Sequence, residues 1–296
     1  LFNALTGLRQ KVGNYPGVTV EKKIGRFSGS HGEPLDLLDL PGTYSLHTRS
    51  PDETVARDVL LGRQTGAPRP DVILCVVDAT NLERNLYLVA QLAELGLPMV
   101  VALNMADLAE RDGVLIDAEA LAECLGCPVV PTVASQCKGL VQLRQALTRQ
   151  LDGSAPRRAP LPPELERIAR SLSETLAREQ DLEPRRALAE ALLLLSKTGE
   201  IEAAMPRSVR VAVEEACRLA DEAGFERVSA LIDARYAWVR EMITRALRTR
   251  GDSAVSFSDR LDGWLTHKIW GWAFFLGVMA VMFFTIFRVA EVPMGW

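Results

Sequence analysis

Short apolar runs alternate with amphipathic stretches through the first half of the chain. Asn81–Leu95 and Gly139–Leu151 carry apolar residues at helical spacing. Strands that alternate with helices favour a doubly wound α/β fold with a mostly parallel sheet. Residues 1–151 are predicted to form this domain, with the more polar run Val20–Phe27 as an edge strand. The runs predicted as its other strands are Leu35–Leu40, Val72–Val77, Met99–Leu103 and Val129–Val130.

The chain changes character after residue 151. Residues 152–163 form a proline-rich linker, which can neither continue a helix nor sit in a central strand. Residues 164–255 then show helical periodicity and are predicted to form an all-α domain. One predicted buried face of this domain consists of Leu165, Ile168, Leu172 and Leu176.

The C-terminal part is far more apolar. Residues 269–287 carry no charge, and a helix of this length spans about 28 Å, close to the hydrocarbon core of a bilayer. A transmembrane helix is predicted over 269–288, after an amphipathic segment at 256–268 and before residues 289–296. Basic residues precede it, so residues 1–268 are expected in the cytoplasm.

Composition excludes some classes of protein. A net charge of −4 argues against a protein that coats nucleic acid. The five cysteines are an odd number, and no second pair accompanies Cys124 and Cys127 at zinc-site spacing. These two cysteines are interpreted as a buried helix-to-strand junction in a protein of the reducing cytoplasm.

A carboxylate and a stiff turn follow the leucine-rich run at 35–40. In nucleotide-binding α/β proteins, an Asp at a strand end holds Mg²⁺ and a following glycine N–H meets the terminal phosphate. Asp39 and Gly42 supply both groups, and Pro41 stiffens the backbone between them. Upstream, Gly17–Val18–Thr19 is a flexible stretch that ends in a hydroxyl suited to Mg²⁺.

A second polar stretch follows the predicted strand Met99–Leu103. Asp107 in Asn104–Met105–Ala106–Asp107 can accept two hydrogen bonds from the N1–H and amino groups of guanine. Adenine has no such donor pair, so this residue would select GTP over ATP. Val133–Ala134–Ser135 follows a further strand and can offer a backbone N–H to guanine O6. These elements, in this order, predict a guanine-nucleotide fold.

At these motifs the chain resembles the ferrous iron transport protein B (FeoB) family of bacterial membrane GTPases. The matching segments include "YPGVTVE", "DLPGTYSL", "NMAD" and "DRLDGWLTHKIWG". The resemblance implies a cytoplasmic P-loop-type GTPase domain, a helical spacer domain that favours GDP binding, and a multi-span pore for Fe²⁺. It also implies bacterial inner-membrane localisation, contact with the lipid bilayer, and small cytoplasmic accessory proteins as further partners; no nucleic-acid partner is expected.

The resemblance assigns roles to single residues. Thr19 matches the switch I magnesium ligand, Asp39 and Gly42 the third GTPase motif, Asn104 and Asp107 the base-reading motif, and Ala134 the fifth motif. The candidate nucleotide-binding set is Gly17, Val18, Thr19, Asp39, Leu40, Pro41, Gly42, Asn104, Met105, Asp107, Val133, Ala134 and Ser135, with Thr19 and Asp39 as candidate metal ligands.

The chain departs from the general GTPase pattern in three places. Met105 replaces the lysine of the base motif, and Thr43 stands where Ras-like proteins have a water-orienting Gln. The phosphate-binding loop G-x-x-x-x-G-K-[ST] does not occur in the sequence and is expected before Leu1, so the chain is interpreted as a fragment. No catalytic residue is assigned; hydrolysis is expected to be slow, with K⁺ as the activator that the resemblance implies.

Two other functions remain open at this stage. A soluble GTPase of ribosome assembly or RNA modification would share the nucleotide fold, but it predicts a basic RNA-binding appendage instead of an acidic balance and an apolar segment. A nucleotide-independent membrane tether is the other alternative. His31, in a glycine-rich turn, is interpreted as exposed rather than as an iron ligand.

Overall fold

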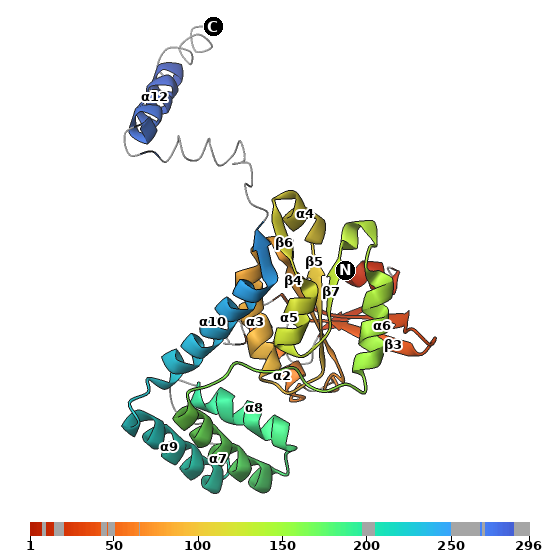
Figure 1. Cartoon of the computed structure of the whole chain (residues 1–296), viewed down its shortest axis with the longest axis vertical. Coiled ribbons are helices and arrows are strands. Elements are labelled where there is room, and N and C mark those ends of the chain that lie inside the picture. Colours follow the sequence, from red (N-terminus) through yellow and green to blue (C-terminus); the bar gives the residue numbers. More distant parts are fainter. Residues whose placement is uncertain are drawn as a thin grey trace. The chain divides into compact units, whose positions relative to one another are not determined.

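The computed structural model describes residues 1–7, 10–14, 21–42, 46, 51–64, 66–196, 205–249, 267 and 270–286. Residues Leu1–Arg248 form one compact unit, and the residues from Thr249 onward form a second. Figure 1 shows the first unit as a sheet-containing part joined to a set of helices.

A parallel sheet lies at the centre of the first unit. It consists of β4 (Ile73–Asp78), β5 (Met99–Asn104) and β7 (Val129–Thr132), in the order β4-β5-β7. The middle strand β5 is apolar at every position from Met99 to Leu103, and all five of these residues are at most 1% exposed. A strand buried on both faces has this continuous apolar pattern.

Helices cover both faces of this sheet. On one face, Met99 and Val101 pack with α3 (Leu82–Ala93) and α5 (Ala118–Leu125). On the other face, Val100 and Ala102 pack with α6 (Leu140–Gln150) and with Leu5 of the short helix α1 (Phe2–Thr6). The predicted doubly wound α/β arrangement is confirmed for these strands and helices.

A second sheet is antiparallel. It consists of β1 (Gln10–Asn14), β2 (Glu21–Ser28) and β3 (Pro34–Asp39), in the order β1-β2-β3. Two predictions are corrected here: the run at 35–40 pairs antiparallel with β2 instead of joining the parallel sheet, and the run at 20–27 is the middle strand instead of an edge. The reason is the tight Gly29–Glu33 turn, closed by a 2.8 Å backbone hydrogen bond, which makes β2 and β3 a hairpin.

Four long helices follow the proline-rich linker: α7 (Pro163–Gln180), α8 (Pro184–Leu195), α9 (Arg207–Glu222) and α10 (Arg227–Ala246). Pro163 and Pro184 stand in the first turns of α7 and α8, where a missing N–H costs nothing. The predicted face of Leu165, Ile168, Leu172 and Leu176 is confirmed, since all four are buried in one cluster with residues of α8 and α9.

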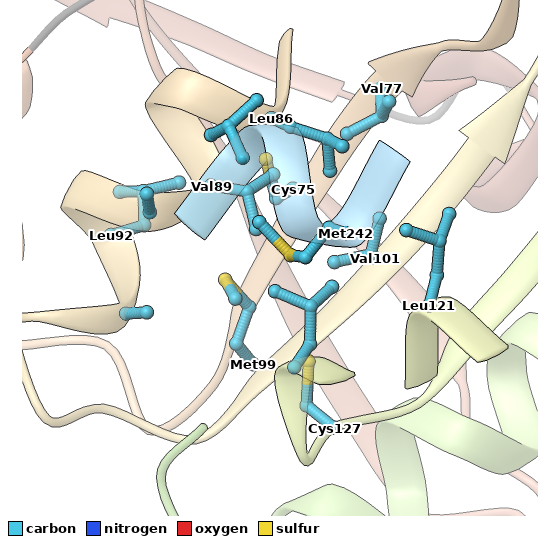
Figure 2. Packing of buried hydrophobic residues seen from close by; sticks show 14 of the residues in the cluster. Cys75, Val77, Leu86, Val89, Leu92, Met99, Val101, Leu121, Cys127 and Met242 are labelled. Atoms are coloured by element: carbon cyan, nitrogen blue, oxygen red, sulfur yellow. The ribbon is translucent and has the colours of Figure 1, made fainter. Parts of the chain in front are cut away.

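The last of these helices, α10, packs against the parallel-sheet region. Its Trp238, Val239, Met242 and Ala246 belong to the buried cluster of β4, β5, α3 and α5. Figure 2 shows Met242 among Cys75, Val89, Met99 and Val101. The chain then forms β8 (Leu247–Thr249), which pairs with β6 (Val114–Ile116). The expected all-helical stretch therefore ends in a strand; the boundaries at 151 and 255 stay predictions.

An ion pair strengthens the attachment of α10. Arg235 bonds both carboxylate oxygens of Glu94, after α3, at 2.8 Å each, and the two side chains are 3% and 9% exposed. Burial by itself lowers the pKa of Arg235, but the hydrogen bonds and charge of Glu94 outweigh it, so the pKa lies above its usual value. Tyr87 of α3 also stacks on Tyr236 of α10, with ring centroids 4.8 Å apart.

The second unit contains the helix α12 (Trp270–Phe284). Within the residues that the structure describes, no helix combines the length and apolar character needed to cross a membrane. The transmembrane helix predicted over 269–288 is therefore not found among the described residues, where α12 has 15 residues and is about 22 Å long. Residues 250–266, 268–269 and 287–296 lie outside the described residues, and with them most of the predicted amphipathic segment at 256–268 and the predicted end at 289–296.

Cys124 and Cys127 lie at the predicted junction. Helix α5 ends at Gly126, whose φ of 67° is left-handed, and β7 begins shortly after it. Both cysteines are buried, and burial raises the pKa of Cys127 to about 12. The interpretation as a buried structural junction is confirmed. His31 is exposed, also as predicted.

Candidate functional site

Three polar residues stand at the carboxyl ends of the parallel strands. The strand register pairs Asp78 of β4 with Asn104 of β5, and Asn104 with Thr132 of β7. Loops leave the sheet at this level, and open α/β sheets bind their ligands outside this edge. The register therefore brings the predicted base motif and the predicted fifth motif to the same edge.

Asn104 holds these two motifs together. Its Oδ1 accepts a hydrogen bond from the Ala134 backbone N–H at 3.1 Å and another from Thr132 Oγ1 at 3.4 Å. Asn104 and Ala134 are thirty residues apart in sequence and in direct contact in the structure. The predicted grouping of these residues is seen here, although their roles toward a nucleotide stay predictions.

Met105 turns the chain from β5 into the short helix α4 (Ala106–Arg111). It adopts a left-handed conformation with φ of 59°, and the residue is 41% exposed. This turn places Asp107 in the first turn of α4, where it is half-buried. Its Oδ2 accepts a hydrogen bond from Gln136 Nε2 at 3.2 Å.

The loop after β7 is closed by its own backbone. Val133 and Lys138 exchange hydrogen bonds of 3.1 and 3.2 Å around the 3₁₀ turn η2 (Ala134–Gln136). Gly139 ends the loop with φ of 79°, and a Cβ there would lie 2.2 Å from the Pro131 carbonyl oxygen. Only glycine fits this close approach, so the loop has a defined shape beside Asn104 and Asp107.

Two residues of this site were missed by the sequence analysis. Thr132 is the last residue of β7. A hydroxyl at the carboxyl end of a predicted strand could have marked it as a site residue. Gln136 contacts Asp107 through a loop whose shape the sequence alone does not reveal. Both bond to residues that were predicted to read guanine.

The other predicted motif lies on the antiparallel sheet. Asp39 ends β3 and is exposed, and Leu40 packs its side chain against the apolar clusters. An exposed carboxylate at a strand end fits a magnesium-phosphate site. Gly17, Val18 and Thr19 lie outside the described residues.

Within the described residues, metal binding by this motif would rest on Asp39 alone. No cluster of three or more His, Cys, Asp or Glu side chains in the described part of the chain is placed to hold a metal ion. Mg²⁺ at nucleotide sites is bound by one or two protein groups together with phosphates and water, so Asp39 as a single carboxylate fits this ion. In the same part of the chain, no hydrogen bond joins Asp39–Gly42 to the group around Asn104.

Comparison with known proteins agrees with this arrangement. Residues 1–147 match the family model described as "Ferrous iron transport protein B". The cytosolic domain of L. pneumophila FeoB has 35% sequence identity and a TM-score of 0.68, over 83% of this chain and 93% of that one. The chain belongs to the FeoB family. A GDP-bound mutant of the S. thermophilus FeoB G domain is also 35% identical, with a TM-score of 0.72 over 83% of this chain and 94% of that one.

Curated FeoB relatives match almost the whole chain. The "Fe(2+) transporter FeoB" of Salmonella typhimurium is 39% identical over 290 residues, which is 96% of this chain and 36% of the relative. A Porphyromonas gingivalis protein described as an "Fe(2+) transport protein A/Fe(2+) transporter FeoB fusion protein" is 35% identical over 311 residues, 100% of this chain and 36% of that protein. The chain thus spans about a third of the length of these relatives.

Proposed function

We propose that this chain is the GTP-binding, regulatory part of a bacterial Fe²⁺ transporter. The observation that carries the proposal is the grouping of Asn104, Asp107 and Ala134 at the carboxyl edge of the parallel sheet. Asp107 would accept the two donors on the guanine edge, and the Ala134 N–H would be donated to O6. The FeoB structures bound to GDP and to GMPPNP, from S. thermophilus and T. maritima, support guanine-nucleotide binding by this chain.

In the proposal, the phosphates lie toward the antiparallel sheet. Asp39 would hold Mg²⁺ through water, Thr19 would add its hydroxyl in the GTP-bound state, and the Gly42 N–H would meet the terminal phosphate. Bound Mg²⁺ neutralises charge on the phosphates. Hydrolysis is slow in this scheme, and K⁺ is its proposed activator.

The whole protein would carry Fe²⁺ across the bacterial inner membrane, with residues 1–268 on the cytoplasmic side. The names of the curated relatives support Fe²⁺ as the transported ion. The fusion protein of P. gingivalis supports an Fe²⁺ transport protein A as one accessory partner. A soluble GTPase acting on RNA is not favoured, since the matched relatives are Fe²⁺ transporters.

Nucleotide choice in the full-length protein tests the proposal. We expect GDP and GTP to displace a fluorescent guanine nucleotide at concentrations at least about 100-fold lower than ADP and ATP, because the Asp107 carboxylate would disfavour bases that lack the donor pair. Equal displacement by adenine nucleotides would contradict it. Fe²⁺ uptake into vesicles that contain the protein, with and without GTP, then tests the link to transport.

A further inference from the structure

Both groups proposed to read guanine are already hydrogen-bonded within the protein. Gln136 Nε2 donates to Asp107 Oδ2 at 3.2 Å, and the Ala134 N–H is donated to Asn104 Oδ1 at 3.1 Å. A guanine base that arrives at this edge therefore meets groups that have partners. It must replace these contacts or add to them.

The two internal contacts differ in how easily they give way. The Ala134 contact is a part-buried bond between the backbone and a side chain that joins two strand ends. The Gln136 contact joins two side chains at the surface, and Gln136 is exposed. A released Gln136 amide is hydrated at once, whereas breaking the Ala134 contact would take a part-buried partner from Asn104 Oδ1, which is costly. Gln136 is the displaceable partner.

Gln136 offers Asp107 the same kind of hydrogen-bond donor as guanine does. A glutamine side-chain amide donates through an NH₂ group, as guanine does through its amino group. The closed backbone of the 133–138 loop places this amide beside Asp107. The Gln136 amide thus occupies Asp107 Oδ2 with the same type of donor as the guanine amino group, which hypoxanthine lacks.

We infer that Gln136 is an internal competitor for the guanine-reading carboxylate. It acts through Asp107: it holds the carboxylate while the site is free, weakens guanine-nucleotide binding, and speeds release by recapturing Asp107 as the base leaves. This inference rests on the proposed function, because it requires Asp107 to read guanine.

The test compares Gln136→Ala and Gln136→Met with wild type in the full-length protein. Both variants remove the amide, and the methionine keeps the length and volume of the side chain. We expect GDP to bind about three- to tenfold more tightly to each variant and to dissociate more slowly, the range expected for losing one net hydrogen bond to a competitor. The matched control is Gln142→Ala, which removes an exposed glutamine from α6 and should leave GDP binding unchanged.

Binding of inosine diphosphate separates competition for Asp107 from a purely structural role of Gln136, which would affect both nucleotides equally. Inosine diphosphate keeps the N1–H and lacks the amino group, so Gln136 competes with it less. The ratio of GDP affinity to inosine diphosphate affinity should therefore rise in both variants. In an Asp107→Ala background, Gln136→Met should have no effect on either nucleotide, because the residue through which it acts is gone.

Each outcome decides something different. Weaker or unchanged GDP binding in Gln136→Met, or an unchanged ratio, would overturn the inference while leaving guanine recognition intact. A wild-type protein that binds guanine and adenine nucleotides equally would overturn the proposed function and this inference with it.

Discussion

The two sheets each carry one half of the proposed nucleotide site, and they are built differently. The parallel sheet carries the proposed base-reading half, and its middle strand β5 is buried on both faces. The antiparallel sheet carries the proposed metal-binding half, and no residue of its strand β3 is fully buried. One side of it bears Arg26 and Asp36, an ion pair whose side chains are 69% and 56% exposed.

This difference indicates how the two halves can behave. Asn104 ends a strand packed by helices on both sides and Asp107 follows it closely, so displacing them means disturbing the core. Asp39 ends a strand without a fully buried residue, and such regions open at lower free-energy cost. A GTPase needs this division, since the base anchors the nucleotide while the groups near the γ-phosphate change position.

The largest expected effect comes from weakening the scaffold of the base-reading half. Glu94→Ala should lower the free energy of unfolding by about 3–5 kcal/mol, because it removes the carboxylate that pairs with the buried Arg235 charge. Urea denaturation followed by circular dichroism measures this loss. The control is Glu222→Ala on α9, which breaks an exposed pair with Arg218 and should leave the free energy of unfolding almost unchanged. Equal losses in the two variants would mean that α10 contributes little to the stability of this half.

The next effect is on the base contact itself. Asp107→Ala in the full-length protein should weaken GTP binding by about 2 kcal/mol or more, because the guanine donors lose their charged acceptor. A fluorescence titration measures it. Asp112→Ala, at the C-terminal end of α4 and exposed, is the control for a lost carboxylate. If Asp107→Ala binds GTP as tightly as this control, Asp107 does not read the base.

The sequence predicted the parts of the fold that depend on burial alone. An apolar run such as Met99–Leu103 is informative because few structures other than a doubly covered strand bury every residue. The face of Leu165 and Leu172 was predictable for the same reason: helical periodicity reports which side is buried. The order of the motifs likewise indicated which residues meet at one edge, since carboxyl ends of parallel strands coincide.

What a segment packs against could not be predicted in the same way. The run at 35–40 has the same apolar character in a parallel or an antiparallel sheet, and only the Gly29–Glu33 turn decides its partner. The apolar face of α10 suits any core, so its place against β4 and β5 was not visible. The contact between Gln136 and Asp107 depends on loop backbone angles that no short pattern encodes.

A smaller effect is expected on the metal-binding half. Asp39→Asn should reduce the Mg²⁺-dependent part of GTP affinity about tenfold, because an amide is a poorer partner for magnesium-bound water than a carboxylate. The measurement compares GTP titrations with Mg²⁺ and with EDTA. Asp36→Asn on the same strand should leave the Mg²⁺ dependence unchanged. An Asp39 variant with the full Mg²⁺ effect would remove this residue from the metal site.

The smallest expected effect is that of Thr19→Ala. It tells most about how the two halves of the site differ, because it should change the affinity for GTP and not for GDP. The Thr19 hydroxyl is expected to reach Mg²⁺ only when the γ-phosphate draws its segment inward, so GDP gains nothing from it. Thr19→Ala should therefore leave GDP affinity unchanged and weaken GTP binding by about 1 kcal/mol, the net value of one hydroxyl contact. Parallel titrations with GDP and a non-hydrolysable GTP analogue measure this difference, with GDP as the internal control. An equal loss for both nucleotides would place Thr19 among static contacts, and the metal-binding half would then not be the part that senses the γ-phosphate.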